Sequence, residues 1–423
     1  MTLLWFSYVA AAIFVNNKTE ISAMNDGVEG QGRAGTGKRF PVAAPNGEIA
    51  RILLSFLATA GLFYVNIMPA LVNGLIDGLG FSNQQAGFVG SANVYGAALG
   101  AFAAVFIVKR IQWKPLSLWL LLGLMAADVF SMYLDTPATL IALRFCHGAI
   151  GGLLVGIGFS IISRTTEADR TFGYLLTVQF GLGGLGLMYL PSLVPEFGTS
   201  VLFLSLIAFS GVTLLMLPFL SDYPIEQPTQ TSANNSAGTG INIKMLSMAL
   251  LAIFLFQAAN MGIYAYIIGM GKHFGQEMGF ISSTLGVAAW IAITGSVLVI
   301  LMSTRYGRVV PIVIATVLTI IGTWVLHYSE QKSMYWIANV GVGITWAFVI
   351  SYLLGMCSEF DAHGQMAALA GFASKMGLAS GPLAAAFLVG DDNYGLLINV
   401  AAVALVGSLL VVILPAFSLD QRN

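Results

Sequence analysis

The sequence predicts an all-α membrane protein in which twelve transmembrane helices form two six-helix bundles. Of the 423 residues, 57% are hydrophobic and only 9% are charged, whereas an average soluble protein has about 25% charged residues. Apolar runs of about 20 residues recur along the chain, and a helix of that length crosses the roughly 30 Å hydrocarbon core of a bilayer. A polar segment near the middle of the chain separates these runs into two sets of six.

Residues 1–49 differ in composition from the rest of the chain. A short apolar stretch, residues 3–15, is followed by a segment rich in Gly, Asn and charged residues. We expect a disordered cytoplasmic tail, because such a segment buries too little apolar surface to fold. Two alternatives stay open. One is a cleaved signal peptide, although no basic residue precedes the apolar stretch; the other is a working protein that starts at Met24.

Candidate spans are apolar runs bounded by Gly, Pro or charged residues. In the first half (50–220) they are residues 52–75, 87–108, 116–134, 138–162, 172–193 and 201–220. Residues 221–244 are rich in Pro, Asn, Thr and Ser, which is typical of a flexible linker. In the second half (245–417) the spans are residues 245–270, 280–302, 309–326, 334–356, 367–388 and 396–415, and residues 418–423 form a short tail.

The basic residues predict the orientation, because Lys and Arg accumulate in cytoplasmic loops. With both termini and the linker in the cytoplasm, only Lys272 and Lys332 lie outside, and Arg144 and Lys375 fall within spans. The cytoplasmic set is Lys18, Arg33, Lys38, Arg39, Arg51, Lys109, Arg110, Lys114, Arg164, Arg170, Lys244, Arg305, Arg308 and Arg422. This asymmetry also supports the helix count, since one missed span would invert every later loop.

Two short motifs accompany the arrangement of six spans, linker and six spans. The loop after the eighth span contains Arg305, Gly307 and Arg308, and the fourth span contains Arg144 and Phe145 followed by Gly148 in an Arg-Phe-x-x-Gly pattern. Together these features resemble the major facilitator superfamily, in which two six-helix repeats surround a binding site near the midplane. The resemblance covers residues 50–417. It implies a secondary transporter with the major facilitator fold and assigns a gating role to the loop around Gly307.

The same resemblance makes the first, fourth, seventh and tenth helices, with parts of the second, fifth, eighth and eleventh, the lining of a central cavity. Polar and aromatic residues recur on these helices at helical spacing. Interhelical hydrogen bonding is the alternative role for each of them. The uncharged candidates for substrate binding are Asn66, Tyr95, Gln257, Asn260, Tyr264, Trp290, Asn339 and Trp346. By contrast, we interpret the small-residue steps Gly96–Gly100 and Gly152–Gly156 as helix packing surfaces.

Charged residues within the spans give the sharpest indication of the substrate. Arg144 and Lys375 are basic, and Asp128 on the third span is the only acid deep in a span. Because a buried cation is neutralised well by a carboxylate, we expect Arg144 and Lys375 to bind an anionic substrate. An ion pair between Arg144 and Asp128 is the structural alternative. His147 changes charge near neutral pH, so His147 and Asp128 are candidates for proton coupling.

The sequence therefore predicts a transporter of a small organic anion, such as an aromatic or other carboxylate, that works by proton-coupled alternating access. The alternative is a proton-driven drug or metabolite exporter. An enzyme is not expected, because the sequence carries neither an HExxH motif nor a complete P-loop. We expect no cofactor, no metal and no nucleic-acid partner. The expected partners are the lipid bilayer, the solute and protons, and we expect a monomer in the cell (inner) membrane if the source is bacterial.

Overall fold

The computed structural model describes residues 42–108, 112–223, 243–302, 305–358 and 365–421. Within these residues the regular structure is helical, apart from one isolated bridge between Arg305 and Gly307. Eleven of the described helices are long and apolar enough to span a membrane. The expected tail up to residue 41 and most of the expected linker (224–242) lie outside the described residues. The prediction of an all-α membrane protein is confirmed.

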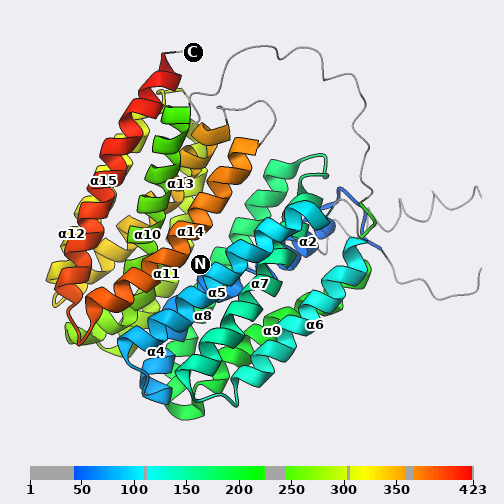
Figure 1. The fold of residues 1–423 in the computed structure, drawn as a ribbon, viewed down its shortest axis with the longest axis horizontal. Coiled ribbons are helices and arrows are strands. Elements are labelled where there is room, and N and C mark those ends of the chain that lie inside the picture. Colours follow the sequence, from blue (N-terminus) through cyan, green and yellow to red (C-terminus); the bar gives the residue numbers. More distant parts are fainter. Residues whose placement is uncertain (1–41, 109–111, 224–242, 303–304, 359–364, 422–423) are drawn as a thin grey trace, which may run out of the picture.

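The helices form two groups that lie side by side (Figure 1). The first group is α2 (Glu48–Ala60), α3 (Phe63–Asn66), α4 (Met68–Leu79), α5 (Asn83–Ile107), α6 (Trp113–Ser131), α7 (Pro137–Ile162), α8 (Ala168–Phe197), α9 (Ser200–Met216) and the 3-10 turn η1 (Leu217–Phe219). The second group is α10 (Ile243–His273), α11 (Met278–Met302), α12 (Val309–Val325), the 3-10 turn η3 (Leu326–Tyr328), α13 (Lys332–Ser358), α14 (Gln365–Val389) and α15 (Tyr394–Asp420). Most helix ends lie within about one turn of the predicted ends.

The first predicted span is interrupted. Instead of one helix over 52–75, the chain forms α2, α3 and α4, with breaks at Gly61 and Ile67. Pro69 in the first turn of α4 lacks the N–H group that would continue the hydrogen-bond ladder, which favours a new helix start at this point. Gly61 also packs closely on α7, because an added Cβ would lie 2.2 Å from the Gly151 carbonyl oxygen.

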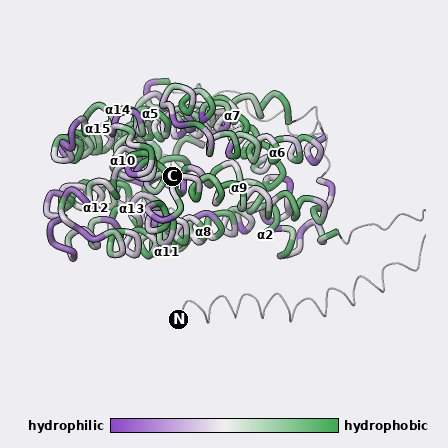
Figure 2. Tube along the Cα trace, turned by 90° about the horizontal axis from the view of Figure 1, so that it is seen from below, coloured by the Kyte–Doolittle hydropathy of each residue, from purple (hydrophilic) through white to green (hydrophobic). Residues whose placement is uncertain are grey.

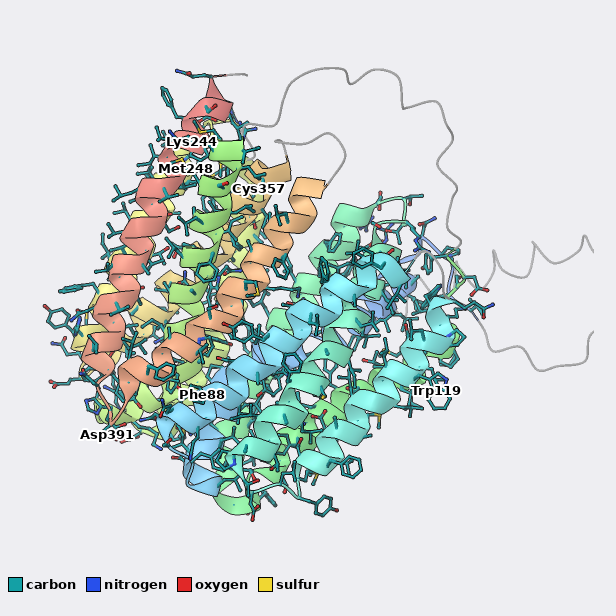
Figure 3. The ribbon with its side chains drawn as sticks, in the orientation of Figure 1. Phe88, Trp119, Lys244, Met248, Cys357 and Asp391 are labelled. Atoms are coloured by element: carbon teal, nitrogen blue, oxygen red, sulfur yellow. The ribbon has the colours of Figure 1, made fainter. Side chains whose placement is uncertain are left out.

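Hydrophobic residues make up most of the trace in both groups (Figure 2). Many large apolar side chains point away from the bundles, as Trp119 does on α6 (Figure 3), and its exposed fraction is 70%. A water-soluble protein rarely exposes contiguous apolar surface on this scale. This outer surface matches the lipid-facing surface of a membrane-spanning bundle.

Polar contacts join the two groups at one end of the molecule, which we call the closed end. It consists of the connections 80–82, 274–277 and 390–393 and the helix ends beside them. Asn83 donates to the Gly390 carbonyl and to Asp392, 3.0 Å in each case, and Lys272 pairs with Asp77 at 2.6 Å. Asp391 lies at this end and Lys244 at the opposite end of the second group (Figure 3). Within the described part of the chain, no hydrogen bond or ion pair is found between the two groups at the Lys244 end.

Candidate functional site: a central pocket between the two groups

A cavity of about 280 Å³ lies between the two groups. Residues of α3, α8, α10, α11, η3, α13 and α14 line it. Its polar lining residues are Asn66, Gln179, Gln257, Asn260, Tyr264, Asn339 and Trp346. None of the lining residues is charged. The volume is close to the lower limit of about 300 Å³ for small-molecule sites, so the pocket fits a small solute.

Six of the ten residues predicted to bind substrate meet in this pocket, namely Asn66, Gln257, Asn260, Tyr264, Asn339 and Trp346. Sequence reasoning missed Gln179 and Phe180 on α8. Gln179 is the only amide in the predicted span 172–193, and the family pattern gives that helix a part of the cavity lining. A single amide in an otherwise apolar span was the signal that could have identified Gln179 as a pocket residue.

The interruption of the first span shapes the pocket directly. Asn66 ends α3, and its backbone carbonyl accepts a hydrogen bond from the Tyr264 hydroxyl at 2.7 Å. Tyr264 belongs to α10 of the other group, so this bond crosses the pocket. The Asn66 side chain donates from Nδ2 to the Gln179 carbonyl at 3.4 Å. A broken helix thus presents main-chain and side-chain polar groups at one point of the cavity.

Gln257 holds the aromatic wall of the pocket. Its Oε1 accepts from Trp346 Nε1 at 2.6 Å, and its Nε2 donates to Ser374 Oγ at 2.7 Å. The Trp346 ring packs edge-on against Tyr264, with ring centroids 5.7 Å apart. Because both functional atoms of Gln257 are engaged, this residue holds Trp346 in a fixed orientation.

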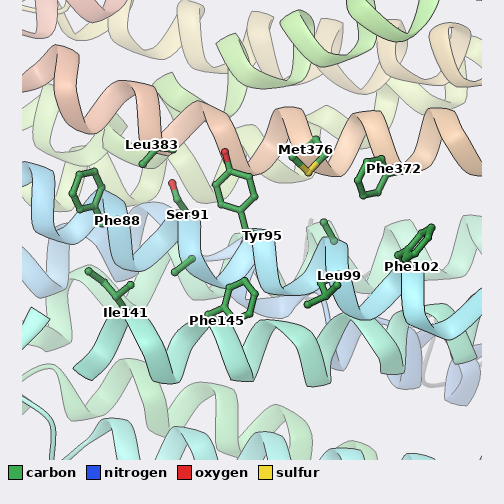
Figure 4. Close-up of a pocket in the computed structure, with 12 residues that line it drawn as sticks. Phe88, Ser91, Tyr95, Leu99, Phe102, Ile141, Phe145, Phe372, Met376 and Leu383 are labelled. Atoms are coloured by element: carbon green, nitrogen blue, oxygen red, sulfur yellow. The ribbon is translucent and has the colours of Figure 1, made fainter. Parts of the chain in front are cut away.

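Trp290 and Tyr95 lie outside the pocket lining, and both join the two groups. Trp290 Nε1 on α11 donates to the Gly181 carbonyl on α8 at 3.0 Å. The Tyr95 hydroxyl on α5 is 2.8 Å from Ser380 Oγ on α14. Tyr95 lines a second, apolar cavity of about 710 Å³ between α5, α7 and α14, together with residues such as Phe88, Leu99 and Phe102 (Figure 4).

Arg144 lies within the first group and not at the pocket. It is fully buried and pairs through Nη1 with Asp128 Oδ1 at 2.7 Å, and Asp128 is fully buried too. Its Nη2 also donates to the Ala127 carbonyl at 3.1 Å and to the Ser131 hydroxyl. The rings of Tyr64 and Phe203 lie 5.8 Å and 5.1 Å from the guanidinium carbon. The structure therefore favours the structural alternative, in which Arg144 forms an ion pair with Asp128.

His147 joins the same buried cluster. Its Nε2 lies 3.3 Å from Asp128 Oδ1, and its Nδ1 lies 2.8 Å from Asn93 Nδ2. The same Asn93 nitrogen donates to the Arg144 carbonyl at 3.2 Å, which identifies it as the amide NH₂ group. His147 Nδ1 therefore accepts, and the ring proton sits on Nε2, directed at Asp128.

Lys375 lies on α14 near the pocket but is not among its lining residues. It is three residues before Leu378, which lines the pocket, so the two share a face of the helix. The Lys375 side chain is half-buried, and no described residue forms an ion pair or hydrogen bond with its ammonium group. Asp128, the acid deep in a described span, is paired with Arg144 and therefore does not neutralise Lys375.

The predicted gating loop folds around an acid from the other end of the sequence. The backbone N–H groups of Arg308 and Val309 donate to Asp420 at 2.8–3.0 Å, and Arg308 Nη1 lies 3.2 Å from Asp420 Oδ1. Asp420 therefore places a carboxylate at the N-terminus of α12. Gly307 has a φ of +68°, which favours glycine. Arg305, the other basic residue of the predicted loop, is exposed.

Comparison with known proteins agrees with this geometry. A sequence model described as Major Facilitator Superfamily matches residues 52–382. No curated protein sequence matches the chain. Among solved structures, the chain is similar to the nucleoside transporter NupG, with a TM-score of 0.66 and 12% identity over 87% of this chain and 98% of that one.

Two further solved structures have the same architecture. A D-xylose-proton symporter matches with a TM-score of 0.65 and 13% identity over 86% of this chain and 96% of that one. A bacterial homologue of the human lysosomal transporter Spinster, in an inward-facing and unoccupied conformation, matches with a TM-score of 0.61 and 14% identity over 90% and 98%. The protein is a multi-pass secondary transporter of small solutes, and it belongs to the major facilitator superfamily.

Proposed function

We propose that this protein transports a small organic anion, such as a carboxylate, by proton-coupled alternating access. One observation carries the choice of an anion: Lys375 lies within a span, beside the central pocket, and no described residue pairs with its ammonium group. A charge in this environment is costly unless a partner of opposite charge meets it. A substrate carboxylate would be that partner. Arg144 supports the proposal less strongly, because Asp128 already neutralises it.

The conformation supports access from the cytoplasm. Polar contacts join the two groups at the closed end, and the positions of the basic residues assign that end to the outside of the cell. The pocket would then open toward the cytoplasm in this state. Alternating access would require the closed-end contacts to break while the groups close at the Lys244 end.

For proton coupling we propose the buried cluster of Asp128, His147 and Arg144. His147 already uses Nδ1 as an acceptor for Asn93, so a second ring proton would require the Asn93 amide to turn. Asp128 can accept a proton on Oδ2, which has no described hydrogen-bond partner. Protonation would neutralise Asp128 and weaken its hold on Arg144, which links proton uptake to helix packing in the first group.

An exporter of amphiphilic compounds is the second candidate. The observation in its favour is the apolar cavity of about 710 Å³ lined by α5, α7 and α14, which is larger than the central pocket and rich in phenylalanine. Such a surface accepts amphiphilic cations as readily as anions. The two candidates differ in whether Lys375 attracts or repels the transported compound.

The test is transport by purified protein in vesicles with an imposed pH gradient, using a panel of carboxylates and amphiphilic cations. A carboxylate should be transported, and Lys375→Gln should raise its apparent Kd roughly tenfold, because a hydrogen bond to a charged group contributes about 1.5–3 kcal/mol. Lys332→Gln, at the exposed start of α13 beside Phe280, is the matched control and should have no effect. Transport of cations that improves in Lys375→Gln would identify the exporter instead.

A further inference from the structure

The three asparagines of the central pocket are all oriented in the same way. Asn260 and Asn339 each donate from Nδ2 to the backbone carbonyl four residues earlier in their own helix, at 2.8 Å. Asn66 donates from Nδ2 to the Gln179 carbonyl. A carbonyl oxygen can only accept, so the group that faces it must be the amide NH₂. The Oδ1 atom of each asparagine is therefore directed away from that carbonyl.

These three oxygens are unused acceptors. Within the described residues, no donor reaches Oδ1 of Asn66, Asn260 or Asn339. Asn260 is the clearest case, since the residue is only 3% exposed and its Oδ1 is buried without a partner. A buried acceptor without a donor is destabilising, which makes it a strong attachment point for a ligand that donates.

Several donor groups of the pocket already have a protein partner. Trp346 Nε1 is bonded to Gln257, Gln257 Nε2 to Ser374, and the Tyr264 hydroxyl to the Asn66 backbone carbonyl. Each side-chain amide NH₂ group has two N–H bonds, so the three asparagines and Gln257 each keep one unused N–H. No described residue bonds to the side-chain amide of Gln179. The pocket therefore offers both acceptors and donors, which suits a hydroxyl group, because a hydroxyl both donates and accepts.

We propose that the substrate is a polyhydroxylated carboxylate: an acid whose hydroxyl groups donate to Asn66, Asn260 and Asn339. Its carboxylate would face Lys375, and this part of the assignment rests on the proposed function. The selection of hydroxyl groups rests on the asparagine acceptors alone. A site built to bond a substrate hydroxyl rejects an analogue without it, because the acceptor is then left buried and unpaired.

The experiment measures Kd for the purified protein with acids of equal chain length that differ in their hydroxyl groups. The pairs are glycerate and propionate, threonate and butyrate, and gluconate and hexanoate, with sorbitol as the uncharged counterpart of gluconate. At least one hydroxylated acid should bind tenfold or more tightly than its unhydroxylated partner, since each satisfied acceptor contributes roughly tenfold. Sorbitol should bind more weakly than gluconate.

Asn260→Leu should remove most of the preference for the hydroxylated acid, measured as the ratio of the Kd values of the two acids. Asn339→Leu is the second variant, used if the first does not fold as judged by its melting temperature. The matched control is Asn399→Leu, because Asn399 pairs with His327 at 2.9 Å at an exposed site on α15. This control should keep the full preference.

The two proposals fail in different ways. If hexanoate, butyrate and propionate bind as tightly as their hydroxylated partners, or if no hydroxylated acid binds, the inference is overturned. If sorbitol binds as tightly as gluconate and Lys375→Gln changes neither, the anion proposal fails while the selection of hydroxyl groups stands. A preference that survives in both asparagine variants would also overturn the inference.

Discussion

Arg144 and Asp128 illustrate how a buried charge can be structural. Both side chains are fully buried, and Arg144 Nε and Asp128 Oδ2 have no described partner. Taking two charges out of water is costly, and their attraction together with the bonds to Ser131 and the Ala127 carbonyl offsets much of that cost. Removing one partner leaves the other charge buried alone, which is the most destabilising change available to this cluster.

Asp128→Asn should therefore reduce the amount of folded protein and its melting temperature, with a cost of about 3–5 kcal/mol in the free energy of unfolding. Transport per folded molecule down the substrate gradient should change less, whereas its response to a pH gradient should be lost, because the amide cannot take up the proton. The double change Asp128→Asn with Arg144→Gln should recover part of the stability, because no unpaired charge remains. Fluorescence size-exclusion chromatography measures abundance, and vesicle transport measures activity.

Two outcomes would contradict this structural role. Normal abundance of Asp128→Asn, whatever its effect on proton coupling, would show that the pair does not stabilise the fold. Normal abundance of Arg144→Gln with a raised Kd for the anion would make Arg144 a substrate ligand, as the sequence suggested. In either case the pair would not be needed for folding.

Helices α5 and α7 approach each other closely because glycine lines their contact. A Cβ added at Gly96 would lie 2.0 Å from the Phe145 carbonyl oxygen, and one at Gly152 would lie 2.0 Å from that of Ala97. Helices in lipid gain no hydrophobic stabilisation from association, so close backbone packing has to hold them together. The small-residue steps in these helices are therefore packing surfaces.

Gly152→Ala should destabilise the folded protein by about 1–3 kcal/mol, since the added methyl group has no space and the helices must separate. Gly341→Ala on α13 is the matched control, because nothing lies within 4 Å of its added Cβ. That change should be neutral or slightly stabilising, as alanine favours a helix over glycine. Thermal unfolding in one detergent compares the two. Equal melting temperatures would refute the packing role.

The closed end joins the two halves of the molecule through weak, reversible contacts. Lys272 and Asp77 pair at 2.6 Å, but their side chains are 39% and 30% exposed. Asp77 also accepts from Asn73 at 2.8 Å. Exposed pairs contribute about 0–1 kcal/mol, which suits contacts that must break in each transport cycle. Tyr266 adds a bond to the Asn83 carbonyl at 2.6 Å.

Asp77→Asn should increase the population that is open at this end, by up to about fivefold. The measurement is the distance distribution between spin labels at Gln84 and Asp391, two exposed positions on opposite halves near this end. Asp222→Asn is the matched control, because Asp222 pairs with Lys114 within one half at 2.8 Å. An unchanged distribution in Asp77→Asn, or equal changes in both variants, would contradict a gating role.

Much of the architecture could be predicted from the amino-acid sequence. Hydropathy alone locates the spans, because a lipid-facing helix has to be apolar along about 20 residues. Helical periodicity identified most of the polar pocket residues, such as Asn66, Asn260 and Asn339, because it tells which residues share a face. The motif around Gly307 indicated the loop between α11 and α12. The orientation in the membrane stays a prediction from the basic residues.

Only the tertiary structure decided how those groups are used. The family resemblance placed Arg144 on a helix of the cavity-lining class, but packing of α6 against α7 brings Asp128, and not the pocket, to Arg144. The carboxylate that binds the predicted gating loop belongs to Asp420, more than a hundred residues later. The side-chain amide of each pocket asparagine is oriented by the backbone carbonyl to which it donates. Partners of this kind are fixed by contacts between helices, and spacing along one helix carries no information about them.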